Sequence, residues 1–244
     1  MISLLGEGLK SLLGAQLLGL YLTGSLTYGD FDRNSSDIDF VVILEKLLSK
    51  DQIQKIQDLH TKIGSSYPKW SNRIECSYLT RKMLLDTTTP LEPRPYVNEG
   101  NFWESAYYGD EWLLNLHALY VCGVPVFGPK PNELIGPINI ELVRETSKKN
   151  LLQEWVPRLN GPSDFFDSHR QVYAVFTFCR ILHRNFNDEI ASKRMAATWV
   201  KKTYGEPWQS LINQAEEWRP GQEINARAQV LYFLRFTLDK IQVA

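Results

Sequence analysis

The spacing of hydrophobic and polar residues differs between the two halves of the chain. Short apolar runs at 17–22 and 40–44 predict two strands, and strict alternation over 73–79 predicts a third. Apolar residues recur at helical spacing over 49–63, so we expect a helix there, ended by Gly64. The first half therefore predicts a mixed sheet flanked by helices.

The second half has helical spacing throughout. Its turn signals separate five predicted helices, at 140–156, 164–186, 192–203, 207–218 and 223–242. A segment rich in proline and glycine at 130–139 divides the two patterns. We therefore expect an α+β protein with one domain at 1–135 and an all-α bundle at 136–244.

Two further segments of the first half carry weaker patterns. Residues 86–110 hold Pro90, Pro93 and Pro95 among several aromatic residues, which predicts a structured loop. Such a loop would line a substrate pocket or simply anchor itself to the body of the protein. Residues 124–129 predict a short edge strand ended by a Gly-Pro turn.

Composition excludes several classes of protein. The 244 residues carry a net charge of −1 with scattered Lys and Arg, so the basic stripe needed for nucleic-acid binding is absent. The apolar N-terminus is interrupted by Glu7 and Lys10, which favours an amphipathic helix over a membrane anchor. The three cysteines are far apart in apolar surroundings, as expected for buried free thiols. These features predict a cytoplasmic protein with no nucleic-acid or membrane partner.

Two carboxylates stand where the second strand begins. Alternation along a strand places Asp37 and Asp39 on one side, with Ile38 facing the core. Paired carboxylates suit Mg²⁺, which prefers oxygen ligands and shares them with substrate phosphates. Gly24 allows close approach of a phosphate, and the Ser25 hydroxyl and the amides that follow would bind its oxygens. The stretch predicts nucleotidyl transfer.

A third acid, Glu75, lies on the next predicted strand. If that strand runs beside the one that follows Asp37, Glu75 shares the face of the aspartates. It would then serve as a general base or as a further metal ligand. No G-x-x-x-x-G-K-[ST] loop and no H-E-x-x-H motif offers a different chemistry.

Gly24-Ser25, followed twelve positions later by Asp37-x-Asp39, resembles the nucleotidyltransferase superfamily of DNA polymerase β. The second half narrows the resemblance to the adenylyltransferases that inactivate streptomycin and spectinomycin. The residues that carry it are Glu75, the Val124–Pro129 run, Cys179-Arg180-Ile181-Leu182, Glu189–Lys193 and Ala196-Ala197-x-Trp199. The resemblance implies that ATP lies between a catalytic domain and a helical domain, and that AMP passes to a small-molecule hydroxyl.

The same resemblance assigns roles to individual residues. Asp37 and Asp39 would bind Mg²⁺, Glu75 would be the base, and Ser25 would contact the triphosphate. Lys193 would contact phosphate, since an ammonium at a helix start neutralises phosphate charge, or would make a contact between the two domains. The full set of candidate nucleotide-binding residues is Gly24, Ser25, Ser36, Lys193 and Glu111.

The departures from the family pattern concern the acceptor. Arg194 and Thr198 stand where these enzymes usually have acids, which weakens Coulomb attraction to a polycationic drug. Three hypotheses therefore stay open. The acceptor is a small molecule such as an aminoglycoside or aminocyclitol; it is a protein hydroxyl, as in toxin–antitoxin systems; or the chain binds nucleotide without turning it over.

Overall fold

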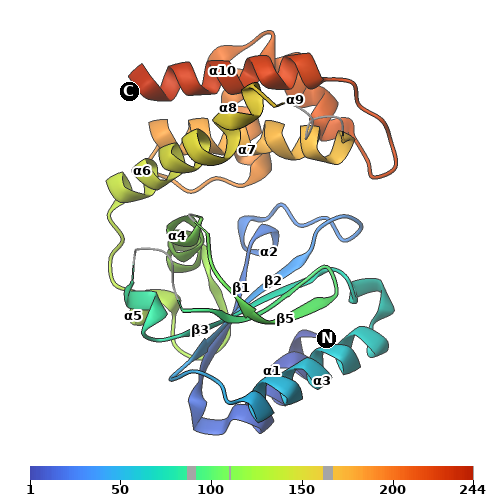
Figure 1. Ribbon diagram of the computed structural model, residues 1–244, viewed down its shortest axis with the longest axis vertical. Helices are drawn as coiled ribbons and strands as arrows, with labels where there is room; N and C mark the ends of the chain where they lie inside the picture. Colours follow the sequence, from blue (N-terminus) through green and yellow to red (C-terminus); the bar gives the residue numbers. More distant parts are fainter. Residues whose placement is uncertain (87–91, 110, 162–166, 244) are drawn as a thin grey trace. The chain divides into compact units, whose positions relative to one another are not determined.

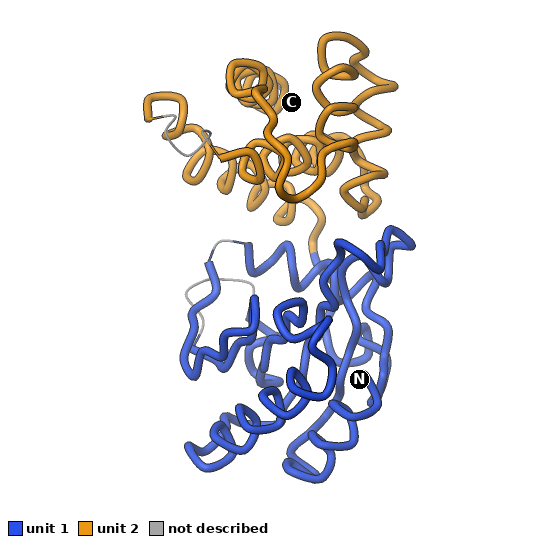
Figure 2. Tube along the Cα trace, turned by 90° about the vertical axis from the view of Figure 1, so that its right-hand side faces the viewer, with its two compact units in different colours: residues 1–138 blue, residues 139–244 orange. Residues whose placement is uncertain are grey.

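The computed structural model describes residues 1–86, 92–109, 111–161 and 167–243. Contacts divide the chain into two compact units, Met1–Ile138 and Asn139–Ala244 (Figure 2). Each unit has its own hydrophobic core. The expected α+β fold class, a mixed sheet with helices followed by an all-helical region, is confirmed.

The first unit is built on a mixed six-stranded sheet in the order β5-β4-β3-β2-β1-β6. Strands β2 and β3 are parallel, and the other neighbours are antiparallel. The strands are β1 (Leu17–Thr23), β2 (Ile38–Leu44), β3 (Ile74–Thr80), β4 (Arg94–Asn98), β5 (Asn101–Ala106) and β6 (Val124–Phe127). The predicted edge strand is therefore confirmed as β6.

Two helices, α1 (Ile2–Leu13) and α3 (Lys50–Ser66), cover one face of the sheet (Figure 1). Their apolar stripes pack on alternate residues of the strands, and Leu9, Phe40 and Val42 are at most 2 % exposed in this core. The acids therefore belong to the opposite face. The remaining helices of this unit are α2 (Ser25–Tyr28), α4 (Trp112–Cys122) and α5 (Pro131–Leu134).

The predicted end of α3 at Gly64 is wrong, because the helix continues to Ser66. A single glycine costs a helix only about 1 kcal/mol, which the packing of the flanking turns offsets. Pro68 accounts better for the end, since proline disfavours helical backbone in the residue before it, here Tyr67.

The loop predicted over 86–110 is also wrong, because β4 and β5 form a hairpin there. Glu99 and Gly100, both with positive φ, make the two-residue turn that hairpins favour. Pro95 interrupts the hydrogen-bond ladder, and the register shifts between Arg94 and Tyr96, so the proline occupies an irregularity. Pro90 lies outside the described residues.

The second unit is helical, as predicted. Its α-helices are α6 (Ile140–Asn150), α7 (Ser168–Phe186), α8 (Lys193–Tyr204), α9 (Trp208–Glu217) and α10 (Arg227–Val243). After α6 the chain makes a π-helical turn, Leu151–Trp155, and a 3-10 turn, Val156–Leu159. The expected first turn of α7, at 164–166, lies outside the described residues. Trp208 stacks on Phe233 with ring centroids 4.7 Å apart in the core.

The structure also tests the expectations about the cysteines and about membrane-spanning helices. All three cysteines are free thiols; Cys76 and Cys179 are buried and Cys122 is half-buried. None of the described helices combines the length and apolar character that a membrane crossing requires.

Candidate active site

Gly24 and Asp39 meet where β1 ends. Thr23 pairs with Asp39 in the β1–β2 ladder, and Gly24 then turns the chain into α2 with φ 65° and ψ −148°. A side-chain Cβ on Gly24 would lie 1.8 Å from Oδ2 of Asp39, closer than two non-bonded atoms can approach. The backbone conformation therefore requires glycine, and any Cβ at this position would also displace the Asp39 carboxylate.

Asp37 stands one residue before β2 and has a 56 % exposed side chain. Arg73, directly before β3, places its Nε 3.9 Å from Oδ1 of Asp37 and donates hydrogen bonds to the carbonyl oxygens of Arg33 and Ser36. Its guanidinium also lies 4.5 Å from the ring centroid of Trp70. Arg73 thus fixes the loop that delivers Asp37, a role that its sequence position did not indicate.

Glu75 lies beside Asp39, as expected from the alternation of the two strands. The residues are register partners on the parallel strands β2 and β3, and partners in a sheet point to the same face. The structure therefore brings Asp37, Asp39 and Glu75 together on the face away from α1 and α3.

Burial raises the pKa of the Glu75 carboxyl above its usual range. The hydrogen bond from Tyr96 and the charge of Arg94 lower this pKa, whereas the nearby charges of Asp37 and Glu111 raise it further. The Tyr96 hydroxyl donates to Oε1 of Glu75 at 2.7 Å. Burial has the largest effect, so the net shift of the Glu75 pKa is upward.

The hairpin supplies residues that sequence patterns missed. Arg94 and Tyr96 alternate along β4 onto the face of Glu75, and Arg94 is only 4 % exposed. Tyr108, just before α4, donates a hydrogen bond to the Ser77 hydroxyl at 2.9 Å. The Glu99-Gly100 pair, which makes the two-residue turn, is the local signal from which a hairpin could have been expected in place of the loop that was predicted.

The other candidate residues occupy different positions. Ser25 is the first residue of α2, and the Ser36 hydroxyl accepts a hydrogen bond from the Asp32 amide at 2.9 Å. Glu111 directly precedes α4, and Lys193 begins α8 in the second unit. Their roles in nucleotide binding stay predictions.

Two carboxylates of this site, those of Asp37 and Asp39, could bind a divalent cation. Asp37 and Asp39 flank the start of β2, and the described residues contain no group of three His, Cys, Asp or Glu that could hold a metal. Two aspartates nevertheless suit Mg²⁺, because this ion is commonly bound by one or two carboxylates together with the phosphates of the substrate. The missing side chain of Gly24 makes room for the carboxylate of Asp39, whose Oδ2 would lie 1.8 Å from a Cβ there.

The cavity found on this unit lies elsewhere. It has a volume of about 760 Å³ and runs between α3 and the hairpin. His60, Asn72, Phe102 and Trp103 are among its lining residues, but none of the candidate acids is. The candidate active site is therefore at the acids, because they carry the chemistry of nucleotidyl transfer and this cavity does not include them.

Two family models match the chain. The first is described as a nucleotidyltransferase domain and matches residues 2–89; the second is described as the C-terminal domain of aminoglycoside adenylyltransferase and matches residues 141–236. The chain belongs to the aminoglycoside adenylyltransferase family. This adenylyltransferase is therefore an enzyme of the nucleotidyltransferase type, as the acids predicted.

A solved structure shares the fold of the adenylyltransferase. It is a spectinomycin adenyltransferase, AAD(9), from Enterococcus faecialis, crystallised with ATP and spectinomycin. The TM-score is 0.73 at 18 % identity, covering 99 % of this chain and 98 % of the other. No curated protein matched.

Proposed function

We propose that this enzyme transfers AMP from ATP to a hydroxyl group of a small molecule. The observation that carries the proposal is the pairing of Asp39 with Glu75 on adjacent parallel strands, beside the bare backbone of Gly24. Membership of the adenylyltransferase family supports it, as does the likeness to a protein crystallised with ATP and spectinomycin.

Asp37 and Asp39 would hold Mg²⁺ together with the triphosphate. When bound, the ion neutralises negative charge on the phosphates. Gly24 lets the backbone approach a phosphate closely, and the Ser25 and Ser36 hydroxyls are candidate ligands of that phosphate from the chain. Lys193 is a further phosphate ligand in this proposal, and Glu111 contributes to nucleotide binding.

Glu75 is the general base. It takes the proton from the acceptor hydroxyl while the acceptor oxygen bonds to the α-phosphorus; the bond from that phosphorus to pyrophosphate breaks, and pyrophosphate leaves. A base works best with a pKa near the operating pH, so the raised pKa of Glu75 suits this role.

An aminoglycoside or aminocyclitol antibiotic is the acceptor that the charges favour. The charges of Asp37 and Glu111 both act on Glu75, and the three acids together would attract a cationic ligand. Arg194 and Thr198 in the second unit reduce that attraction, so an acceptor with few amines fits better than a polycation.

Pyrophosphate release tests the proposal. Purified protein is mixed with Mg·ATP and, one at a time, with spectinomycin, streptomycin and other aminoglycosides. We expect release that depends on one acceptor and falls by about 10²–10⁴ in Glu75→Gln, the usual contribution of a general base.

Glu45→Gln is the matched control. Glu45 directly follows β2, and its half-exposed side chain pairs with Arg81 at 3.6 Å, so its loss should leave the rate unchanged. Label from ATP appearing on protein would indicate a protein acceptor. Tight ATP binding without release under any acceptor would contradict the proposal.

A further inference from the structure

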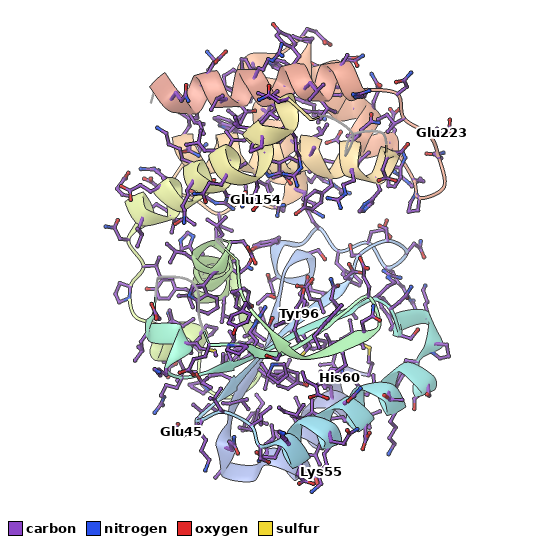
Figure 3. All side chains as sticks on the ribbon, in the orientation of Figure 1. Glu45, Lys55, His60, Tyr96, Glu154 and Glu223 are labelled. Atoms are coloured by element: carbon purple, nitrogen blue, oxygen red, sulfur yellow. The ribbon has the colours of Figure 1, made fainter. Side chains whose placement is uncertain are left out.

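One hydrogen bond reaches the proposed base from the neighbouring strand. Tyr96 on β4 pairs with Ser77, two residues after Glu75, so its ring lies on the face of the acids. Its hydroxyl donates to Oε1 of Glu75 at 2.7 Å in a part-buried position. Figure 3 labels Tyr96 on the sheet.

A buried cation holds the tyrosine ring in place. The Arg94 guanidinium lies 5.0 Å from the ring centroid of Tyr96 and 3.4 Å from that of Tyr108. Arg94 also donates to the Ala106 carbonyl oxygen at 2.8 Å, which ties it to β5. The guanidinium therefore contacts both rings and has little room to move.

The contacts around Tyr96 and Arg94 lead back to β3, the strand that carries Glu75. Tyr108 donates to Ser77, the residue that follows Glu75 on the same face of β3. Trp112 packs on Tyr108 with ring centroids 4.8 Å apart, and its indole nitrogen donates to the Asp86 carbonyl oxygen at 2.7 Å. Contacts thus connect Glu75 through Tyr96, Arg94 and Tyr108 back to β3.

We propose that Tyr96 is a positioning residue for the reaction: it holds Oε1 of Glu75, so that Oε2 takes the proton of the acceptor hydroxyl. The inference rests on the proposed adenylyl transfer. A glutamate side chain has three rotatable bonds, and a hydrogen bond at one oxygen selects the conformers that present the other. Misplacement of a reacting group by even 1 Å costs rate steeply.

A double-mutant cycle in the full-length protein tests this inference. Tyr96→Phe keeps the ring and its packing but deletes the hydroxyl. We expect kcat to fall by about 10- to 100-fold, the range of one hydrogen bond to a charged group, with little change in KM for ATP or acceptor. In the Glu75→Gln background the same change should have almost no effect on kcat, because Tyr96 acts through Glu75.

Tyr67→Phe is the control, since Tyr67 is an exposed tyrosine at the end of α3. A crystal structure of Tyr96→Phe adds a readout independent of turnover, and we expect the Glu75 carboxylate to adopt other rotamers. The inference about Tyr96 is overturned, and the proposed function is not, if Tyr96→Phe lowers kcat equally in the wild-type and Glu75→Gln backgrounds. The same holds if Tyr96→Phe changes neither the Glu75 rotamer nor the rate. A wild type that releases no pyrophosphate overturns the proposed function and this inference together.

Discussion

Gly24 illustrates how strongly one residue constrains this site. Its φ and ψ lie in a region that is essentially restricted to glycine, and Oδ2 of Asp39 occupies the place that a side chain would need. Gly29, four residues after Ser25, also has a positive φ of 78°, but a Cβ there would meet nothing within 4 Å. A substitution at Gly29 therefore tests backbone strain alone, whereas a substitution at Gly24 adds a collision with Asp39.

Gly24→Ala should remove activity and destabilise the fold. The added Cβ must displace Asp39 in addition to the backbone strain of about 1–3 kcal/mol. Gly29→Ala should show only the strain, with ATP binding retained. Urea unfolding and ATP titration of both variants measure these effects. Normal ATP binding by Gly24→Ala would contradict the geometry described for the site.

Helix α3 and strand β3 are joined by a polar contact inside the core. His60, labelled in Figure 3, is 9 % exposed. Its Nε2 lies 2.6 Å from the hydroxyl of Tyr78. Burial lowers the pKa of His60 to about 4, so the ring stays neutral in the folded protein at pH 5. The packing of these two elements therefore depends on a histidine that has not taken up a proton.

This contact predicts acid sensitivity. His60 has an ordinary pKa of about 6.5 in the unfolded chain and a pKa of about 4 in the folded protein. At pH values between these two, the unfolded chain binds a proton at His60 and the folded chain does not. The free energy of unfolding therefore falls as the pH falls through this range. The His60 contribution to this loss from pH 7.5 to pH 5 is about 2 kcal/mol. It should vanish in His60→Gln, whose amide can still bond Tyr78.

His169→Gln, at an exposed histidine, is the control for that experiment. Urea unfolding at the two pH values, followed by hydrogen exchange in peptides from α3 and β3, gives the comparison. An equal pH dependence in wild type and His60→Gln would show that His60 is not the group responsible.

At the scale of the whole molecule, the chain builds two separate cores. One joins α1 and α3 to the sheet, and the other joins α7, α8, α9 and α10 with the turns after α6. Each is made from residues of one unit, which is the pattern expected of domains that fold by themselves.

Fragments 1–138 and 139–244 should therefore each unfold cooperatively. The matched control is fragment 148–244, which lacks the buried residues Val143 and Ser147 of α6 and should be less stable. Thermal circular dichroism measures all three. A fragment 139–244 without a cooperative transition would show that the second core needs the first unit.

Local patterns by themselves determined the strands 17–22, 40–44 and 73–79, the helical second half and the three acids. These depend on alternation and helical spacing, which are properties of neighbouring residues. The position of Glu75 beside Asp39 needed one further assumption, that the two strands are neighbours, and the sheet confirms it.

Only the tertiary structure decided the surroundings of those acids. Arg94, Tyr96 and Tyr108 converge on β3 because a hairpin forms in a segment whose prolines predicted a loop, and no local spacing encodes that pairing. The raised pKa of Glu75 likewise depends on burial by distant segments. Local spacing therefore identifies the reactive groups, whereas contacts between distant residues set their orientation and charge.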